Sequence, residues 1–377
     1  MTGRAIKYIM LKMEPGTADQ GDDGVGQAPA AIDVHAHAIP PSVAAPGSAW
    51  SWHDQPLKRR PDGSLELATS IGRQAIAWSQ EAEDIGVRLR YMDEVGVDMQ
   101  VLSLMPSLWM YDVEGHDSLS AARHSNDDLV EVASQHPRRF RVFAHLPLDR
   151  PDDAVAELER MMASDVVVGA GVGTNVAGKN WDEPELFPLL EAAERLGALL
   201  FFHPAAGRFN AHLRRHHLRN LIGNPAETTV AIADLIFGGV LDRLPSLRAV
   251  FAHGGGYACL AGGRFDHGYR ARGDVREHAA ELPSSYLRRL YFDNLVHDDA
   301  ALRYLVDTVG LGQVVLGTDY PADMGPADPV RPLLASPTFD GAEKQAILAG
   351  NLAGLIGVDP ADIGPASSSG RTAAHHG

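Results

Sequence analysis

Two histidines near the start of the chain have the spacing of a metal site. The segment from Ala31 to Ile39 alternates apolar and polar residues, which predicts a β-strand. Side chains two positions apart on a strand point the same way, so we expect Asp33, His35 and His37 on one face. Two imidazoles on a rigid strand can bind one metal ion, which in enzymes supports hydrolytic or lyase chemistry. Such a pair also occurs by chance, so the rest of the chain must supply further ligands.

Three further candidate residues come at the ends of later predicted strands. His203 ends the fifth strand, His253 ends the sixth and Asp319 ends the eighth. One histidine at a strand end is more often a core or loop residue than a ligand, but five ligand-type residues at matching ends are not expected by chance. Three imidazole nitrogens and one carboxylate suit Zn²⁺ with an open position, and other divalent first-row metals are alternatives.

The elements that must position these residues are short β-rich runs that alternate with amphipathic helical runs. Eight strands alternating with helices favour a closed parallel (β/α)8 barrel of the TIM type. We expect strands at 31–39, 99–105, 140–147, 166–172, 198–203, 248–253, 290–296 and 313–319. We expect helices at about 84–95, 119–136, 152–163, 184–196, 225–243, 257–271, 298–309 and 341–356.

The chain divides into a leader, a barrel and a tail. Residues 1–30 show no clear period and are expected to be a flexible leader, and residues 361–377 are expected to be a disordered tail. The barrel then covers 31–360. Its insertion at 40–83, rich in Pro, Gly and Trp, starts just past the first strand and is expected to form a lid or small subdomain over the site.

Composition limits the function classes. The chain has 377 residues and a net charge of −16, so a nucleic acid is not an expected partner. Cys259 is the only cysteine, which excludes a disulfide within the chain and suits a reducing compartment. No run approaches the roughly 20 apolar residues of a membrane helix. These features predict a soluble cytoplasmic protein with no membrane contact.

The fourth predicted strand indicates one metal rather than two. Binuclear metal-dependent hydrolase barrels use a modified lysine at this strand end to bridge two ions. Here the strand at 166–172 contains no lysine. Lys179 comes several residues later in a Gly-rich loop and is expected to be a solvated charge. One metal per chain is therefore favoured.

Two residues near the sixth strand could act on a substrate. Gly254, Gly255 and Gly256 follow His253; they either form a tight turn or let the backbone approach a ligand. We favour the second reading, with His253 as a general acid or base beside the metal. Arg264, eleven residues on, could bind a carboxylate bidentately, although an arginine on a helix is usually solvated.

Other residues of chemical interest are given a structural interpretation. The basic stretch between Arg208 and Arg219, which includes three histidines, is expected at the surface, although it follows the fifth strand and could border the site. Trp50, Trp52 and Trp109 are expected to serve packing. The chain contains no Walker loop, no dinucleotide Gly fingerprint and no zinc-finger cysteines.

Four motifs together resemble those of a known family. The motifs are WDEPELFP at 181–188, PAETT at 225–229, FAHGGG at 251–256 and LGTDYP at 316–321. With them, the chain resembles the aminocarboxymuconate-semialdehyde decarboxylase group of the amidohydrolase superfamily, from about Ile32 to Val358.

The resemblance implies roles for individual residues. It implies a Zn²⁺ site whose ligands agree with the strand-end argument: His35, His37, His203 and Asp319. It implies that His253 deprotonates metal-bound water and shuttles protons. It also implies that Arg264 reaches the site of a neighbouring subunit in a homodimer, and that Arg73 in the insertion is a second substrate arginine.

One departure from the family bears on the substrate. The family usually has Trp and Asp after the His-Pro pair of the fifth strand, where this chain has Ala205 and Ala206. This change predicts a pocket of different shape and polarity, and relatives act on aromatic acids such as resorcylate or carboxyvanillate. The sequence thus predicts a Zn-dependent decarboxylase of a small unsaturated or aromatic carboxylic acid, in which His253 or Asp319 moves the proton. The alternatives are a C–C or C–N hydrolase with the same metal, or a barrel that only binds a ligand.

Overall fold

The computed structural model describes residues 29–44, 80–109, 111, 117–205, 207–208 and 212–365. Between 45 and 79 it describes only the backbone of short strands. The expected leader lies outside the described residues except for its last two positions, and the expected tail lies outside them from residue 366 onward. Both remain predictions.

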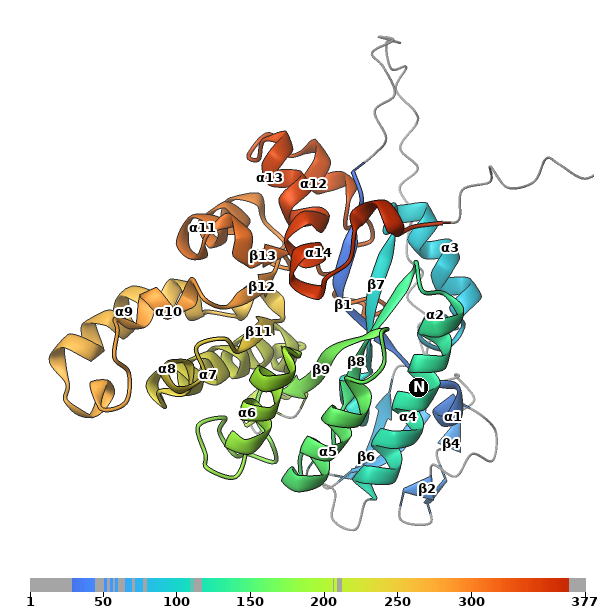
Figure 1. The fold of residues 1–377 in the computed structure, drawn as a ribbon, viewed down its shortest axis with the longest axis horizontal. Coiled ribbons are helices and arrows are strands. Elements are labelled where there is room, and N and C mark those ends of the chain that lie inside the picture. Colours follow the sequence, from blue (N-terminus) through green and yellow to red (C-terminus); the bar gives the residue numbers. More distant parts are fainter. Residues whose placement is uncertain are drawn as a thin grey trace, which may run out of the picture.

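Eight parallel strands form one nearly closed barrel, which confirms the predicted TIM fold (Figure 1). In sheet order the strands are β1 (Ile32–Ala38), β7 (Met99–Leu104), β8 (Phe140–His145), β9 (Val167–Gly173), β10 (Leu199–His203), β11 (Arg248–Phe251), β12 (Tyr291–Asp293) and β13 (Val314–Val315). The ring is brought together where the Val34 amide donates to the Leu316 carbonyl at 2.9 Å and Ala36 bridges in parallel to Tyr320.

Helices follow the strands and surround the barrel. Capping carboxylates fix the first turn of three of the longer helices: Asp84, Asp117 and Asp298 each accept a hydrogen bond from a backbone amide of the helix that follows. The longer helices are α3 (Ile85–Val95), α4 (Ser118–Gln135), α5 (Pro151–Met161), α6 (Phe187–Leu196), α7 (Asn224–Phe237), α9 (Ala258–Ala271) and α11 (Asp299–Val309). The shorter ones are α1 (Pro41–Ala44), α2 (Gln80–Glu83), α8 (Val240–Arg243), α10 (Pro283–Leu287), α12 (Arg331–Ala335), α13 (Gly341–Gln345) and α14 (Asn351–Ile356).

The helix expected at 225–243 is in fact two helices. It breaks at Gly238 and Gly239, and Gly239 has a φ of +65°. A side chain at Gly239 would lie 2.5 Å from the His278 carbonyl, so a residue without Cβ is needed where the chain turns from α7 into α8. The expected helix at 341–356 is continuous but contains a π turn at Ala346–Gly350.

The insertion after the first strand has β-structure of its own. β2 (Ser51–Trp52) and β3 (Gln55–Pro56) pair in antiparallel fashion. β4 (Lys58–Arg59), β5 (Leu65–Thr69) and β6 (Gly72–Ile76) form a small antiparallel sheet. The side chains of these strands lie outside the described part of the chain, so the predicted lid role remains a prediction.

Candidate metal centre

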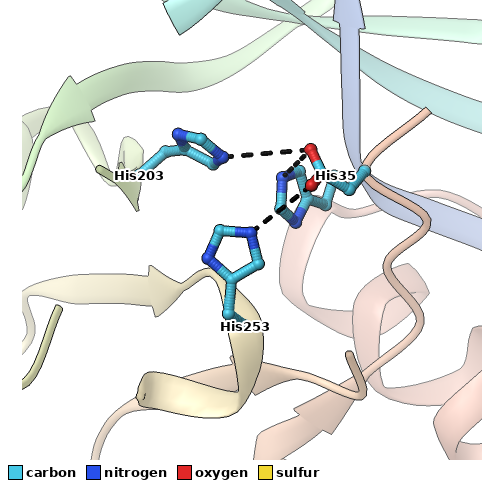
Figure 2. Close-up of side chains that lie close together, drawn as sticks. His35, His203 and His253 are labelled. Carbon is cyan, nitrogen blue, oxygen red and sulfur yellow. Dashed lines mark ion pairs between the residues drawn. The ribbon is translucent and has the colours of Figure 1, made fainter. Parts of the chain in front are cut away.

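Histidines from different strands converge on one carboxylate at the carboxyl end of the barrel. Ligand-type atoms of His35, His203, His253 and Asp319 all lie within 4.8 Å of one another (Figure 2). From the carboxylate of Asp319, the distances to Nε2 are 3.2 Å for His35, 4.0 Å for His203 and 3.5 Å for His253. His37 joins the group, because its Nε2 lies 3.2 Å from Asp319 Oδ1 and 3.1 Å from His35 Nε2. All five residues singled out from strand ends are therefore together.

The first-strand histidines are held by partners that fix which nitrogen faces the cluster. His35 donates from Nδ1 to Asp293 Oδ2 at 2.7 Å. The Ser103 hydroxyl donates to the Ala36 carbonyl at 3.1 Å, so at 2.8 Å it accepts from His37 Nδ1. Both rings are therefore protonated at Nδ1, and both turn Nε2 toward Asp319. Such partners typically orient metal-binding histidines.

Asp33 does not share the face of the two histidines as expected. The pairing of β1 with β7 shifts register between Asp33 and Ala36, and a bulge of this kind re-aims side chains. Asp33 instead accepts from the Thr318 hydroxyl at 2.7 Å and from Gln100 Nε2 at 2.9 Å. It also accepts from the His35 amide at 2.9 Å, so it fixes the backbone of β1 next to the cluster.

A fully buried arginine, which sequence reasoning missed, supports the same strand from outside. Arg88 on α3 donates to Gln100 Oε1 at 3.0 Å and to the His37 carbonyl at 2.6 Å. Gln100 in turn donates to Asp33, so the buried carboxylate and the buried guanidinium are linked through one amide. This chain of bonds holds the end of β1, where both histidines lie.

His253 and Asp319 lie just beyond their strands rather than at the last strand residue. β11 ends at Phe251, and His253 begins a 3₁₀ turn with a φ of +56°. β13 ends at Val315, and Asp319 has a φ of +55°. Positive φ is uncommon for residues with a Cβ and is typical of functional sites. The predicted strand ends were wrong by a few residues here, because the backbone turns to aim both side chains at the cluster.

Asp293 at the end of β12 is the second residue that sequence reasoning missed. Its Oδ2 accepts from His35 Nδ1 and from the His253 amide at 2.9 Å. Its Oδ1 accepts from the Gly254 amide at 2.7 Å and the Leu295 amide at 3.1 Å. One buried carboxylate therefore orients a first-strand histidine and the turn that carries His253. The strand-end rule missed it because the expected strand ran on to residue 296, three residues beyond the end of β12.

The charges of the cluster are strongly coupled. Burial alone would raise the pKa of Asp319, but His35 and His253 hold it well below its usual range. Burial alone would lower the pKa of His35, yet the carboxylates of Asp319 and Asp293 raise it to about 10. Burial and the neighbouring imidazoles lower the pKa of His37 to about 4 and place that of His203 well below its ordinary value. An ionised carboxylate and neutral imidazoles are metal-ligand forms, and His37 and His203 have the neutral form; His35, protonated beside its two carboxylates, would bind a metal only after giving up its Nε2 proton.

The donor set fits a divalent metal ion. In a tetrahedral site with bonds of about 2.0–2.2 Å, ligand atoms lie about 3.3–3.6 Å apart. The distances from Asp319 Oδ1 to Nε2 of His35, His37 and His203, and the distance between Nε2 of His35 and of His37, lie between 3.1 and 4.0 Å and bracket that value. Among the described residues, neither ring nitrogen of His203 has a hydrogen-bond partner, although the residue is buried. A metal ion bound at Nε2, the nitrogen that faces Asp319, would give that atom a partner.

The space at the end of β9 is filled, which favours one metal over two. A Cβ at Gly171 would lie 3.2 Å from the Trp109 ring, and one at Gly173 would lie 3.0 Å from the Tyr111 ring. Trp109 is buried, which confirms its expected packing role, and its Nε1 donates to the Leu104 carbonyl at 2.9 Å. Lys179 lies half exposed and pairs with Glu185 at 2.7 Å, as expected for a solvated charge.

The two predicted substrate arginines are not brought to the cluster in the described part of the chain. Arg73 belongs to β6, but its side chain lies outside the described residues. Arg264 is exposed on α9, a helix that extends away from the barrel together with α10 (Figure 1). It lines a cavity of about 400 Å³ with Phe237 and Phe265 rather than facing His35 or Asp319.

Comparisons with known proteins agree with this geometry. The family model described as amidohydrolase matches residues 32–355. The chain is 38% identical over 278 residues to 2-amino-3-carboxymuconate-6-semialdehyde decarboxylase from Dictyostelium discoideum, covering 74% of this chain and 77% of that protein. The crystal structure of 5-carboxyvanillate decarboxylase from Sphingomonas paucimobilis has a TM-score of 0.75 at 25% identity, covering 88% of this chain and 100% of that one. A structure of dihydroxybenzoic acid decarboxylase from Polaromonas sp., with bound manganese, has a TM-score of 0.69 at 21% identity over 87% of this chain and 97% of that one. Within the described residues, no helix combines the length and apolar character needed to cross a lipid bilayer.

Proposed function

Because the chain belongs to the amidohydrolase family, we propose that it is a metal-dependent carboxy-lyase that decarboxylates a small unsaturated or aromatic carboxylic acid. The observation that carries the proposal is the convergence of three histidines and one aspartate at the carboxyl end of the barrel. The named relatives are decarboxylases, which supports a lyase.

We assign the metal ligands to His35, His37, His203 and Asp319. Nitrogen ligands with one carboxylate suit Zn²⁺, and Mn²⁺ is the alternative that the Polaromonas sp. enzyme suggests. When bound, the ion supplies Lewis-acid polarisation of an oxygen. Hydrogen bonds made by Ser103 and Asp293 hold the ligand residues in fixed positions around Asp319, so the chain itself organises the site.

We assign proton transfer to His253, with Asp319 as the group that shares its proton. The His253 side chain is 16% exposed, twice the 8% of His203 and Asp319, so it is the cluster member most accessible to a substrate. Its Nε2 lies 3.5 Å from Asp319 Oδ2. A proton delivered from His253 to the carbon that loses CO₂ would complete the replacement of C–CO₂⁻ by C–H.

We assign carboxylate binding to Arg73 and Arg264, the latter across the interface of a homodimer. Arg264 is exposed on a helix that leaves the barrel, so it is suited to reach a neighbouring subunit. Leu260 on the same helix is 72% exposed. Tyr257, just before the helix, and Tyr304, whose hydroxyl donates to the Cys259 carbonyl, are exposed as well. Exposed apolar side chains on one side of a molecule are typical of an interface.

Product analysis tests the proposal. Purified protein of measured metal content would be incubated with 2,6-dihydroxybenzoate, 5-carboxyvanillate and muconate-type acids, and the products identified by mass spectrometry. A carboxy-lyase releases CO₂ and one organic product that lacks the carboxylate. Two organic products would identify the C–C or C–N hydrolase instead, and metal-independent turnover would contradict the metal's role.

A further inference from the structure

The PAETT motif at 225–229 takes no part in the proposed chemistry, although it contains a buried carboxylate. The motif forms the start of α7, and the residue at its centre, Glu227, is completely buried. A buried carboxylate is costly unless it is paired and hydrogen-bonded. The partners of Glu227 should therefore show what the motif does.

Glu227 joins the segments that follow two neighbouring strands of the barrel. Its Oε1 accepts from the Arg208 amide at 2.5 Å, and its Oε2 accepts from Arg208 Nε at 3.0 Å and from Asn175 Nδ2 at 3.1 Å. Asn175 comes two residues after the end of β9, and Arg208 comes five residues after His203, the last residue of β10. One carboxylate therefore ties together the chain that leaves β9 and the chain that leaves β10.

The start of α7 also packs against the turn that follows His253. A Cβ at Gly256 would lie 2.1 Å from the Pro225 carbonyl oxygen, so the last glycine of the FAHGGG motif is needed where PAETT approaches. The Thr229 hydroxyl donates to the Pro225 carbonyl at 2.7 Å and accepts from the Tyr257 amide at 2.8 Å. The two motifs thus fit each other, and the start of α7 contacts the chain that leaves β9, β10 and β11.

His203 is the proposed histidine ligand that most needs such support. The other two histidine ligands each have an orienting partner at Nδ1. Among the described residues, neither ring nitrogen of His203 has a hydrogen-bond partner. Its carbonyl accepts from the Thr174 amide at 3.2 Å, which fixes the backbone on the side of β9. The direction of the ring therefore depends on how the backbone around His203 is held.

We propose that Glu227 is a positioning residue of the metal centre. By tying Arg208 to Asn175, it holds the chain that leaves β10 and keeps His203 aimed at Asp319. This inference rests on the proposed function, in which His203 is a metal ligand. Glu227 binds no metal and touches no substrate in this role, since it acts through the backbone.

The test compares Glu227→Gln with a matched control, Glu157→Gln. Glu157 on α5 is also buried, and it too accepts from an asparagine and an arginine: Asn126 Nδ2 at 2.7 Å and Arg160 Nε at 2.8 Å. Each variant turns one carboxylate oxygen into a donor, so both should lose stability in urea unfolding of the metal-free protein. Metal affinity would be measured by competition with a chromogenic chelator, at a temperature where circular dichroism shows every metal-free protein to be folded. The visible spectrum of bound Co²⁺, which depends on its ligands, would report the geometry of the site.

We expect Glu227→Gln to bind the metal about tenfold more weakly, at the lower end of the loss of about 10–100-fold that follows removal of a direct orienting partner. Its Co²⁺ spectrum should change, because His203 is displaced. Glu157→Gln should keep the affinity and the spectrum of the wild type. Unchanged affinity and spectrum in Glu227→Gln would overturn the inference, as would an equal loss of affinity in Glu157→Gln.

A milder variant keeps the inference testable if Glu227→Gln does not fold. Arg208→Lys keeps the positive charge but loses the guanidinium bonds to Glu227 and to the Asn180 carbonyl oxygen. It should weaken metal binding in the same direction and to a smaller extent, and unchanged affinity would overturn the inference.

None of these measurements depends on turnover, so they are separate from the test of CO₂ release. His203→Ala tests the ligand assignment itself. Wild-type metal affinity in His203→Ala would contradict that part of the proposed function and the inference with it. Loss of metal in His203→Ala together with unchanged affinity in Glu227→Gln would refute the positioning role alone.

Discussion

Replacing Asp293 by asparagine should disorganise the metal centre without removing any of its proposed ligands. The carboxylate accepts from His35 Nδ1 and the His253 amide through one oxygen, and from the Gly254 and Leu295 amides through the other. In Asp293→Asn one oxygen becomes an NH₂ group, which donates. In either orientation of the amide, two donors therefore face a third donor, and the negative charge beside His35 is lost.

The magnitude follows from these bonds. A buried donor that loses its acceptor costs about 1–3 kcal/mol, so two such donors lower the free energy of unfolding by about 2–6 kcal/mol. Loss of a carboxylate that orients a metal-binding histidine typically weakens metal affinity about 10–100-fold. We therefore expect Asp293→Asn to remain folded at low temperature, to bind the metal about 10–100-fold more weakly, and to lose activity even when saturated with metal, because His253 is displaced.

The assay measures metal affinity by competition with a chromogenic chelator, together with urea unfolding of the metal-free protein. Asp242→Asn is the matched control, since Asp242 accepts from the Tyr286 hydroxyl at 2.6 Å and the Ala280 amide at 2.8 Å, with no contact to the cluster. The control should lose stability but keep its metal affinity. If Asp293→Asn binds metal within about twofold of wild type, the proposed positioning role is refuted.

Three further predictions follow from the same structure. His253→Ala should keep the metal and lose about 10²–10⁴-fold in activity, whereas His203→Ala should lose both metal and activity. Elemental analysis measures the metal content of each variant, and an empty site in His253→Ala would identify His253 as a ligand. Burial and the Asp182 carboxylate raise the pKa of Asp234 to about 7, above the ~3.9 of an unfolded chain. Its ionisation therefore opposes folding, and the free energy of unfolding should fall as pH rises from about 4 to 7. Urea unfolding of Asp234→Asn should show no such fall, whereas an unchanged dependence on pH would contradict the assignment. Mixing inactive Arg264→Ala with inactive His253→Ala under subunit exchange should restore part of the activity if Arg264 serves the partner's site, and none if it serves its own chain.

The barrel and the members of its site could be predicted from local sequence. Alternation and apolar runs located all eight strands, because each strand carries its own pattern of buried residues. Knowledge of the fold then brought His35, His203 and Asp319 together, since a parallel barrel gathers its strand ends at one edge. Long-range contacts were not needed for that step.

The details that aim the side chains could not be predicted in this way. The bulge that turns Asp33 toward Gln100 depends on how β1 pairs with β7, which no single segment encodes. The positive φ of His253 depends on hydrogen bonds from backbone amides to Asp293, which lies 40 residues further on. In the sequence, Arg88 looks like any other arginine on an amphipathic helix. Only the packing of α3 against β1 shows that it is buried and supports the end of that strand.

We propose that this metal centre catalyses loss of CO₂. The most direct measurement incubates the metal-loaded protein with acids labelled with ¹³C at the carboxylate and quantifies labelled CO₂ and organic products by mass spectrometry. We expect labelled CO₂ in a 1:1 ratio with one decarboxylated product, abolished by a chelator and restored by one equivalent of divalent metal per chain. Label retained in an organic acid, or turnover that survives complete metal removal, would contradict it.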